Sequence, residues 1–145
     1  MTTNYKKAKA LLAISFAPGF ISPNIPIATF KQKDKELNFI IDTGSDHNVI
    51  DKDALSSIEH VIDKDKLYDL TGLGVTGENK VKTCDVTFQY EEDTFTEAFL
   101  ISDLKGPFST IKQCHAIPLH GMLGSNFLKK NNLILDFNNL IAYNK

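Results

Sequence analysis

The 145-residue sequence has no tryptophan, only two cysteines and no marked excess of either charge. Lysine and arginine number 16 against 18 for aspartate and glutamate, so the formal net charge is -2. A protein that follows a nucleic-acid backbone needs a basic stripe, and this chain has none, so we expect no nucleic acid as a partner. The sequence also has no apolar run long enough to span a bilayer, and we expect no membrane span.

The few cysteines and histidines do not form a recognisable metal or disulfide pattern. Cys84 and Cys114 could pair, but two cysteines in a chain of this size are more often buried free thiols. Cys114, His115 and His120 are close in sequence, without the Cys-x-x-Cys or His-x-x-x-His spacing of metal sites. We therefore expect neither a metal nor another cofactor.

The beginning of the chain has some features of a secretion signal. Lysines precede the apolar segment 10–17, but this segment is short, Pro18 interrupts it, and no clear small-x-small cleavage site follows. We expect instead a strand or short helix that packs at the edge of the domain or on a partner chain, and a cytoplasmic protein. The sequence thus divides into an N-terminal extension or edge segment, residues 1–24, and one domain, residues 25–145, large enough for a real core but too short for duplicated halves.

From residue 25 onward, short apolar alternations indicate a mainly β fold. Strands are predicted at residues 25–30, 37–41, 81–90, 94–101, 133–137 and 140–143. A charged turn over residues 31–36 and an acidic turn over residues 91–93 join two of the strand pairs.

Two short helices and one loop complete the prediction. Residues 51–58 can form a short helix with Asp51 as its N-cap, and Ser125 or Asn126 can cap a helix over residues 127–131. Residues 102–117 contain a Gly-Pro pair and little periodicity, so we expect a loop there.

The most distinctive stretch is residues 39–50, FIIDTGSDHNVI. Three apolar residues carry Asp42 to the end of a buried strand, and Gly44 follows in a turn. Burial and a tight turn are the conditions that perturb the pKa of a carboxylate. Asp42 is therefore the candidate catalytic residue.

A glycine-rich stretch follows at residues 68–81. Its glycines alternate with apolar residues, whereas a phosphate-binding loop would need a following Gly-Lys-Ser/Thr and a helix. We predict a β-hairpin with a pliant tip; an ordinary turn without ligand contact is the alternative.

Two segments together resemble a known family. Residues 40–45, Ile-Ile-Asp-Thr-Gly-Ser, resemble the active-site signature of the retropepsin-like aspartic proteases, and residues 119–128, LHGMLGSNFL, are similar to the second signature of that family. The resemblance follows the family's order over residues 25–143. It implies a retropepsin-like acid-protease β-barrel with one or two short helices. It also implies a homodimer, because the chain holds a single Asp-Thr-Gly.

One position departs from the viral members of the family. They usually carry an arginine after the glycine of the second signature, and it braces the acid that follows the catalytic turn. Here that position is Ser125, and the acid that loses the brace is Asp46. Cellular and bacterial members often lack this arginine, so the resemblance favours a non-viral branch.

The resemblance also implies roles for individual residues. Two Asp42 carboxylates would share one proton and activate a water that attacks a peptide bond of an extended polypeptide. Thr43 would fix the two turns relative to each other, and Gly44 would leave room for the substrate backbone. Ser45 is expected to donate a hydrogen bond toward the carboxylate.

The predicted substrate-binding residues belong to three segments. The glycine-rich hairpin would be the flap over the bound peptide, and the other positions follow the catalytic turn or lie in the second signature. They are Asp46, Gly72, Leu73, Gly74, Val75 and Met122.

Two other functions stay open at this point. The same fold with an idle dyad could bind an extended segment by strand addition. Alternatively, the chain is a plain β-rich domain in which Asp42 only caps a turn.

Overall fold

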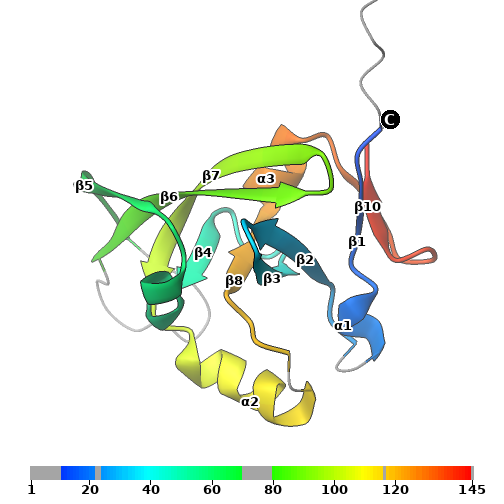
Figure 1. Ribbon diagram of the computed structural model, residues 1–145, viewed down its shortest axis with the longest axis horizontal. Coiled ribbons are helices and arrows are strands. Elements are labelled where there is room, and N and C mark those ends of the chain that lie inside the picture. The colour runs from blue at the N-terminus through cyan, green and yellow to red at the C-terminus, as the bar shows by residue number, and fades with distance from the viewer. Residues whose placement is uncertain (1–10, 22–23, 70–79, 116, 145) are drawn as a thin grey trace, which may run out of the picture.

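The computed structural model describes residues 11–21, 24–69, 80–115 and 117–144. Strands dominate it, as the sequence predicts (Figure 1). The elements are β1 (Ala13–Ser15), α1 (Pro18–Ile21), β2 (Ile27–Gln32), β3 (Lys35–Ile41), β4 (Asn48–Asp51), the 3-10 helix η1 (Asp53–Ser57), β5 (Val61–Asp69), β6 (Lys80–Tyr90), β7 (Asp93–Ser102), α2 (Lys105–His115), β8 (Gly121–Leu123), α3 (Ser125–Lys130), β9 (Ile134–Asp136) and β10 (Ile141–Tyr143).

Seven of the strands form one sheet that closes on itself. Their order is β2-β3-β8-β4-β7-β6-β5, and an additional pairing of β2 with β6 joins the ends of the first six strands. The result is a closed six-stranded barrel with β5 outside the ring. The predicted mainly β barrel is confirmed.

β8 lies between the two strands that enter and leave the Asp42 turn. It runs parallel to β3, with Leu123 opposite Ile41, and antiparallel to β4, with Met122 opposite Val49. The second signature segment is thus inserted into the sheet beside the first, although about 80 residues of sequence separate them.

Aromatic rings fill the interior of the barrel. The ring centroids of Phe30 and Phe88 are 4.9 Å apart at an interplanar angle of 80°, the edge-to-face arrangement that aromatic pairs favour. These rings belong to the main hydrophobic core cluster, whose fully buried aromatic residues are Phe16, Phe30, Phe39, Phe88, Phe99 and Phe127. Successive residues of a strand point to opposite faces, so Ile40 of β3 belongs to a second cluster on the other face of the sheet.

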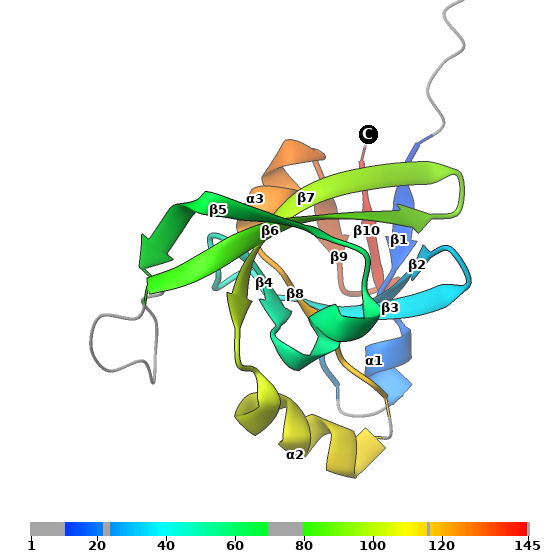
Figure 2. The same cartoon turned by 60° about the vertical axis from the view of Figure 1, so that its left-hand side comes forward.

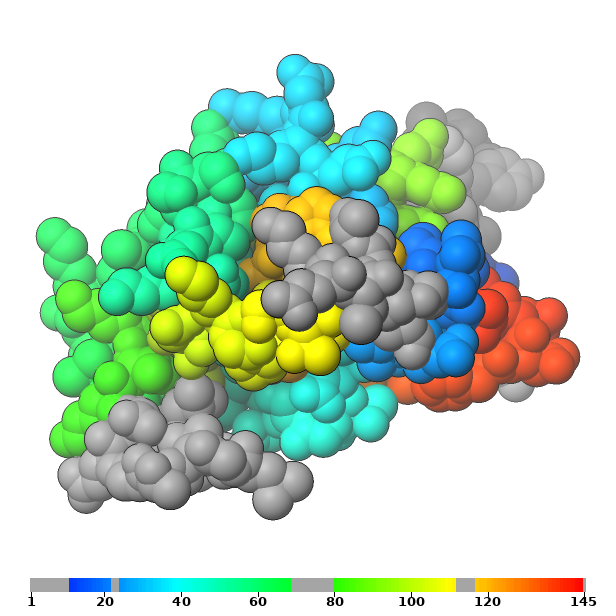
Figure 3. All heavy atoms as spheres, turned by 90° about the horizontal axis from the view of Figure 1, so that it is seen from below, coloured from blue at the N-terminus to red at the C-terminus, as the bar shows by residue number. Residues whose placement is uncertain are grey.

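Helix α2 covers this second cluster, and the prediction of a loop over residues 102–117 was wrong. Leu104 and Phe108 are buried there, and Ile111 packs against the same cluster, so their spacing follows one face of a helix. Pro107 lies in the first turn, where a missing N–H removes no intrahelical hydrogen bond. Figure 3 shows α2, in yellow, on the surface of the lower face of the molecule.

Two predicted details near strand ends were also wrong. The turn between β2 and β3 is shorter than residues 31–36, because pairing continues to Gln32 opposite Lys35. Lys33 adopts a φ of 54° in the resulting tight turn. Asp51 does not cap the helix that follows it; its Oδ1 accepts a hydrogen bond of 2.9 Å from the N–H of Leu104, at the start of α2.

The N-cap of α3 also differs from the predicted one. The helix begins at Ser125 with Gly124 as its N-cap, and no side chain donates or accepts a cap hydrogen bond. Neither Ser125 nor Asn126 is therefore the cap. The predicted end is confirmed: Asn131 is the C-cap, and Asn132 has a φ of 53°.

The two ends of the described chain meet in a second, three-stranded sheet. β1 pairs with β10, and β10 pairs with β9, as Figure 2 shows. The strands predicted at residues 133–137 and 140–143 are confirmed as β9 and β10, and the expected strand or short helix before Pro18 is the edge strand β1. The division of the chain after residue 24 stays a prediction.

β5 is the edge strand of the seven-stranded sheet, and no strand is predicted over most of its length from the sequence. It pairs antiparallel with β6 up to Asp69 opposite Lys80. These strands stand on either side of the glycine-rich segment, whose tip, residues 70–79, lies outside the described residues. No helix in the described part of the chain is both long and apolar enough to cross a membrane.

Candidate active site

Asp42 follows β3 directly and is held by backbone hydrogen bonds on both sides. Its N–H donates to the carbonyl oxygen of Leu123 at 2.9 Å, and its own carbonyl accepts from the N–H of Ser45 at 3.2 Å. The carboxylate oxygen Oδ1 accepts the N–H of Gly44 at 3.0 Å. The half-buried side chain is therefore fixed at the end of the strand, as the sequence pattern predicts.

Ser45 does not support the carboxylate in the way that we expected. Its hydroxyl donates to the carbonyl oxygen of His47 at 2.6 Å. A hydroxyl has one proton to donate, so this bond takes the proton that was expected to point toward Asp42. The role of Ser45 in this structure is to close the turn of residues 45–47.

The tip of the turn faces solvent. Thr43 and Gly44 are exposed, and so is Asp46. The Asp46 carboxylate lies 3.7 Å from Nε2 of His47, and its side chain is 89% exposed. Because this pair is so exposed, it contributes little to the stability of the turn.

The second signature segment packs against this turn without free space. A Cβ atom at Gly124 would lie 2.6 Å from the carbonyl oxygen of His47 and 2.7 Å from that of Ser45, closer than any side chain can approach. The N–H of Ser125 donates to the carbonyl oxygen of Ser45 at 2.7 Å. The absence of a side chain at Gly124 thus allows the two backbones to approach this closely.

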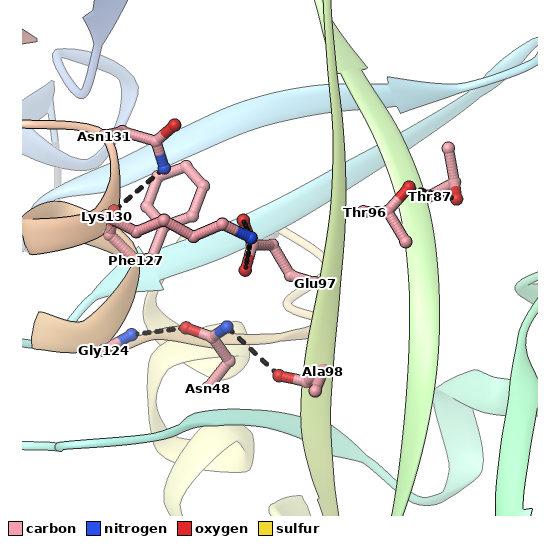
Figure 4. Close-up of polar contacts among 9 residues, drawn as sticks. All are labelled: Asn48, Thr87, Thr96, Glu97, Ala98, Gly124, Phe127, Lys130 and Asn131. Carbon is pink, nitrogen blue, oxygen red and sulfur yellow. Dashed lines mark hydrogen bonds and ion pairs between the residues drawn. The ribbon is translucent and has the colours of Figure 1, made fainter.

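Sequence reasoning missed Asn48, the first residue of β4. Its side chain is buried, with 1% of the residue exposed. Oδ1 accepts the N–H of Gly124 at 2.9 Å, and Nδ2 donates to the carbonyl oxygen of Ala98 at 3.1 Å (Figure 4). The one signal in the sequence is an amide residue at the head of an apolar strand, where a buried side chain needs hydrogen-bond partners.

A cavity of about 170 Å³ lies beside the exit of the turn. His47 and Asn48 line it together with Asn126 of α3 and with Lys66 and Tyr68 of β5. The rings of His47 and Tyr68 are 5.8 Å apart between centroids. β5, the strand before the glycine-rich segment, therefore reaches the neighbourhood of the Asp42 turn.

The structure says less about the remaining predicted substrate-binding residues. Met122 lies in the middle of β8, half-buried against the cluster under α2. Gly72, Leu73, Gly74 and Val75 lie outside the described residues. Their contact with a substrate stays a prediction.

A larger cavity, about 380 Å³, lies elsewhere on the barrel and is lined by residues such as Gln32, Glu59 and Thr87. None of the predicted site residues lines it, and we assign it no function. Across the described residues, no group of three or more His, Cys, Asp or Glu side chains is arranged to hold a metal ion. Cys84 is buried, and burial raises the pKa of its thiol to about 11, which makes it a poor nucleophile.

A six-stranded barrel with an Asp-Thr-Gly turn, and with β8 inserted between the strands on either side of that turn, defines a retropepsin-like fold. No family model matches the sequence, and no curated protein matches it. The solved structures that are similar to the chain include the following two. The EIAV protease complexed with the inhibitor HBY-793 aligns with a TM-score of 0.51 and 21% identity, over 80% of this chain and 96% of that one.

The second structure is a retropepsin-like aspartic protease from Rickettsia conorii. It aligns with a TM-score of 0.53 and 17% identity, over 92% of this chain and 90% of the other. The resemblance noted in the sequence is thus confirmed for the fold: the chain has the fold of the retropepsin-like aspartic proteases. At these identities the likeness concerns the fold alone.

Proposed function

We propose that the protein is an aspartic endopeptidase that works as a homodimer. Two Asp42 carboxylates, one from each chain, activate a water molecule that hydrolyses a peptide bond. The observation that carries the proposal is the geometry of the Asp42 turn: the carboxylate is fixed by the N–H of Gly44 at 3.0 Å, while the tip of the turn faces solvent.

The need for two carboxylates follows from the chemistry. One group must accept a proton from water while another polarises the peptide carbonyl, and a single carboxylate cannot do both at once. Two carboxylates a few ångströms apart share one proton, because ionising both is unfavourable. The chain holds one Asp-Thr-Gly, so a second copy supplies the second Asp42.

The substrate in this proposal is an extended polypeptide that crosses the Asp42 turn. The exposed Thr43 and Gly44 leave the turn accessible to the second chain and to the substrate backbone. Asp46 is exposed and available to bind the substrate main chain. The polar cavity beside His47 and Asn48 is large enough to take a substrate side chain.

The first test is cleavage of a diverse peptide mixture across about pH 3 to 7, the range in which carboxylate dyads titrate. Asp42→Asn should abolish cleavage. Asp34→Asn is the matched control, because it removes an exposed acid from the turn at the opposite end of β3, and it should cleave like the wild type. If the wild type binds peptides and cleaves none, the protein is instead a peptide-binding module.

The homodimer is tested by dilution and by mixing. A site shared by two chains makes specific activity fall as the protein is diluted below its dimer dissociation constant. Excess Asp42→Asn should also inhibit the wild type, because mixed dimers contain one carboxylate only. Specific activity that is independent of concentration, or insensitive to the variant, would contradict the shared site.

A further inference from the structure

We propose that Asn48 is a positioning residue for the Asp42 turn. Its carboxamide fixes the start of α3 and the backbone of the turn at a set distance from β7, and thereby fixes the Asp42 carboxylate. This inference rests on the proposed function for the importance of Asp42, but the contacts that carry it are independent of any activity.

Both halves of the Asn48 carboxamide form hydrogen bonds. Oδ1 accepts the N–H of Gly124, and Nδ2 donates to the carbonyl oxygen of Ala98. The residue is 1% exposed, so water cannot replace either partner. A buried amide that is hydrogen-bonded at both its oxygen and its nitrogen is held in one position. The Asn48 side chain therefore links β4, β7 and the β8–α3 junction.

Gly124, which accepts no side chain, packs tightly against the Asp42 turn. Gly124 touches the carbonyl oxygens of Ser45 and His47 so closely that no methyl group would fit between them. The next residue, Ser125, donates its N–H to Ser45, and the N–H of Ser45 donates to the carbonyl of Asp42. A shift of Gly124 is therefore passed to Asp42 through backbone contacts.

The structure also supplies a matched control. Lys130, at the other end of α3, contacts β7 through an ion pair of 3.2 Å with Glu97 (Figure 4). Glu97 and Ala98 are adjacent in β7, so both contacts join the same two parts of the chain. In the described structure, the hydrogen bonds and the ion pair of the Glu97 and Lys130 side chains join these residues to each other and not to the Asp42 turn, so changing the pair tests the general packing of α3.

The decisive variant is Asn48→Asp. When the introduced carboxyl is protonated, it has the shape of the carboxamide and can both donate and accept a hydrogen bond. When it ionises, it loses the donor and places a charge against the carbonyl of Ala98. We expect kcat near the wild-type value at about pH 4 and lower by about tenfold or more at about pH 6.5, with KM little changed.

Asn48→Ala loses both hydrogen bonds at every pH. Its kcat should therefore be lower by about tenfold throughout, whereas Glu97→Gln should stay within about twofold of the wild type. The ionisable residues that line the cavity beside Asn48 are His47, Asp63, Lys66, Tyr68 and Asp85. They are present in every variant, so a pH limb that is found only in Asn48→Asp reports on the introduced carboxyl.

Amide hydrogen exchange of the full-length protein separates this inference from the proposed function. Asn48→Ala should speed amide exchange at Gly124 and Ser45 and leave exchange in the β2–β3 hairpin unchanged. If that variant does not fold, exchange of Asn48→Asp is compared with exchange of the wild type at about pH 4 and again at about pH 6.5, and the two should differ only at the higher pH. Unchanged exchange and kcat in the Asn48 variants, or an equal loss of kcat in Glu97→Gln, would overturn the inference. A wild type that cleaves nothing overturns the proposed function instead, and exchange still decides whether Asn48 holds the turn.

Discussion

The backbone N–H of Ser125 donates a hydrogen bond of 2.7 Å to the carbonyl oxygen of Ser45. The two residues belong to the two segments that resemble protease signatures, so this bond joins them directly. It uses the main chain of Ser125, while the side chain of Ser125 is exposed. The attachment of the helix to the turn through this bond therefore does not depend on the side chain at position 125.

Replacing Ser125 by proline removes this hydrogen bond and also places the proline Cδ where the N–H pointed, against the carbonyl oxygen of Ser45. Ser125 is the first residue of α3, where proline is normally well tolerated because the N–H has no partner within the helix. Gly124 has a φ of -90° and a ψ of -177°, which is compatible with a following proline. We expect Ser125→Pro to lower the free energy of unfolding by at least about 2 kcal/mol and to reduce kcat, because the bond to Ser45 is lost and the proline ring pushes against the Ser45 carbonyl.

Ser125→Ala is the control for this experiment. It removes only the exposed hydroxyl and should change the free energy of unfolding by less than about 0.5 kcal/mol. Urea unfolding and peptide cleavage measure both effects. Equal stability of the two variants would show that the Ser125–Ser45 bond does not hold the turn.

Ser45→Ala tests which group receives the hydroxyl proton. Because Ser45 donates to His47, the substitution should leave the acidic limb of the pH–rate profile where it is. It should lower the free energy of unfolding by about 1 kcal/mol, the usual net contribution of one hydrogen bond. If instead the acidic limb moves to higher pH, the hydroxyl interacts with the Asp42 carboxylate in the working enzyme.

The strands and the Asp42 turn could be predicted because their signals are local. Alternation of apolar residues marks a half-buried strand, and three apolar residues before Asp42 mark the end of one. The failure at α2 has a physical reason too. A Gly-Pro pair favours a loop when only the sequence is considered. In the structure, Gly106 and Pro107 both occupy the first turn of α2, where neither breaks a hydrogen bond.

The contacts of Asn48 could not be predicted in the same way. Its partners Ala98 and Gly124 are 50 and 76 residues away in the sequence. A single asparagine after a turn is ordinary in a β protein, and it becomes distinctive only when the fold closes around it. The misassigned proton of Ser45 has a different origin: both oxygen acceptors lie within two or three residues, and the sequence does not choose between them.

His120 should make the stability of the protein fall in mild acid. Its Nδ1 accepts the backbone N–H of Asn38 at 3.0 Å, which requires the neutral ring. Burial first, and then the charge of Lys35, hold the pKa of His120 below its usual 6.5. The unfolded chain therefore binds a proton more readily than the folded one, and stability decreases as the pH falls below about 6.5.

Urea unfolding between about pH 5 and 8 measures this slope. His120→Gln should flatten it, and Lys35→Met should shift the pKa of His120 upward in an NMR titration because one repelling charge is removed. A wild-type free energy of unfolding that stays constant below pH 6.5, or a slope that persists in His120→Gln, would show that His120 does not control this part of the curve.

The ion pair between Glu97 and Lys130 should respond unequally to the loss of either partner. Glu97 is 7% exposed and Lys130 is 62% exposed at the side-chain level. Lys130→Met leaves a buried carboxylate without its cation, which should lower the free energy of unfolding by about 1–3 kcal/mol, less than for a pair buried at both ends. Glu97→Gln removes the charge itself and should cost less.

The double variant gives the sharper test of this pair. Adding Glu97→Gln to Lys130→Met removes the uncompensated buried charge, so the double variant should be more stable than Lys130→Met alone. Urea unfolding of the four proteins completes the double-mutant cycle. If the two effects simply add, the carboxylate of Glu97 is solvated without Lys130, and the attachment of α3 to β7 depends on the Asn48 contacts and on the packing of Phe127 instead.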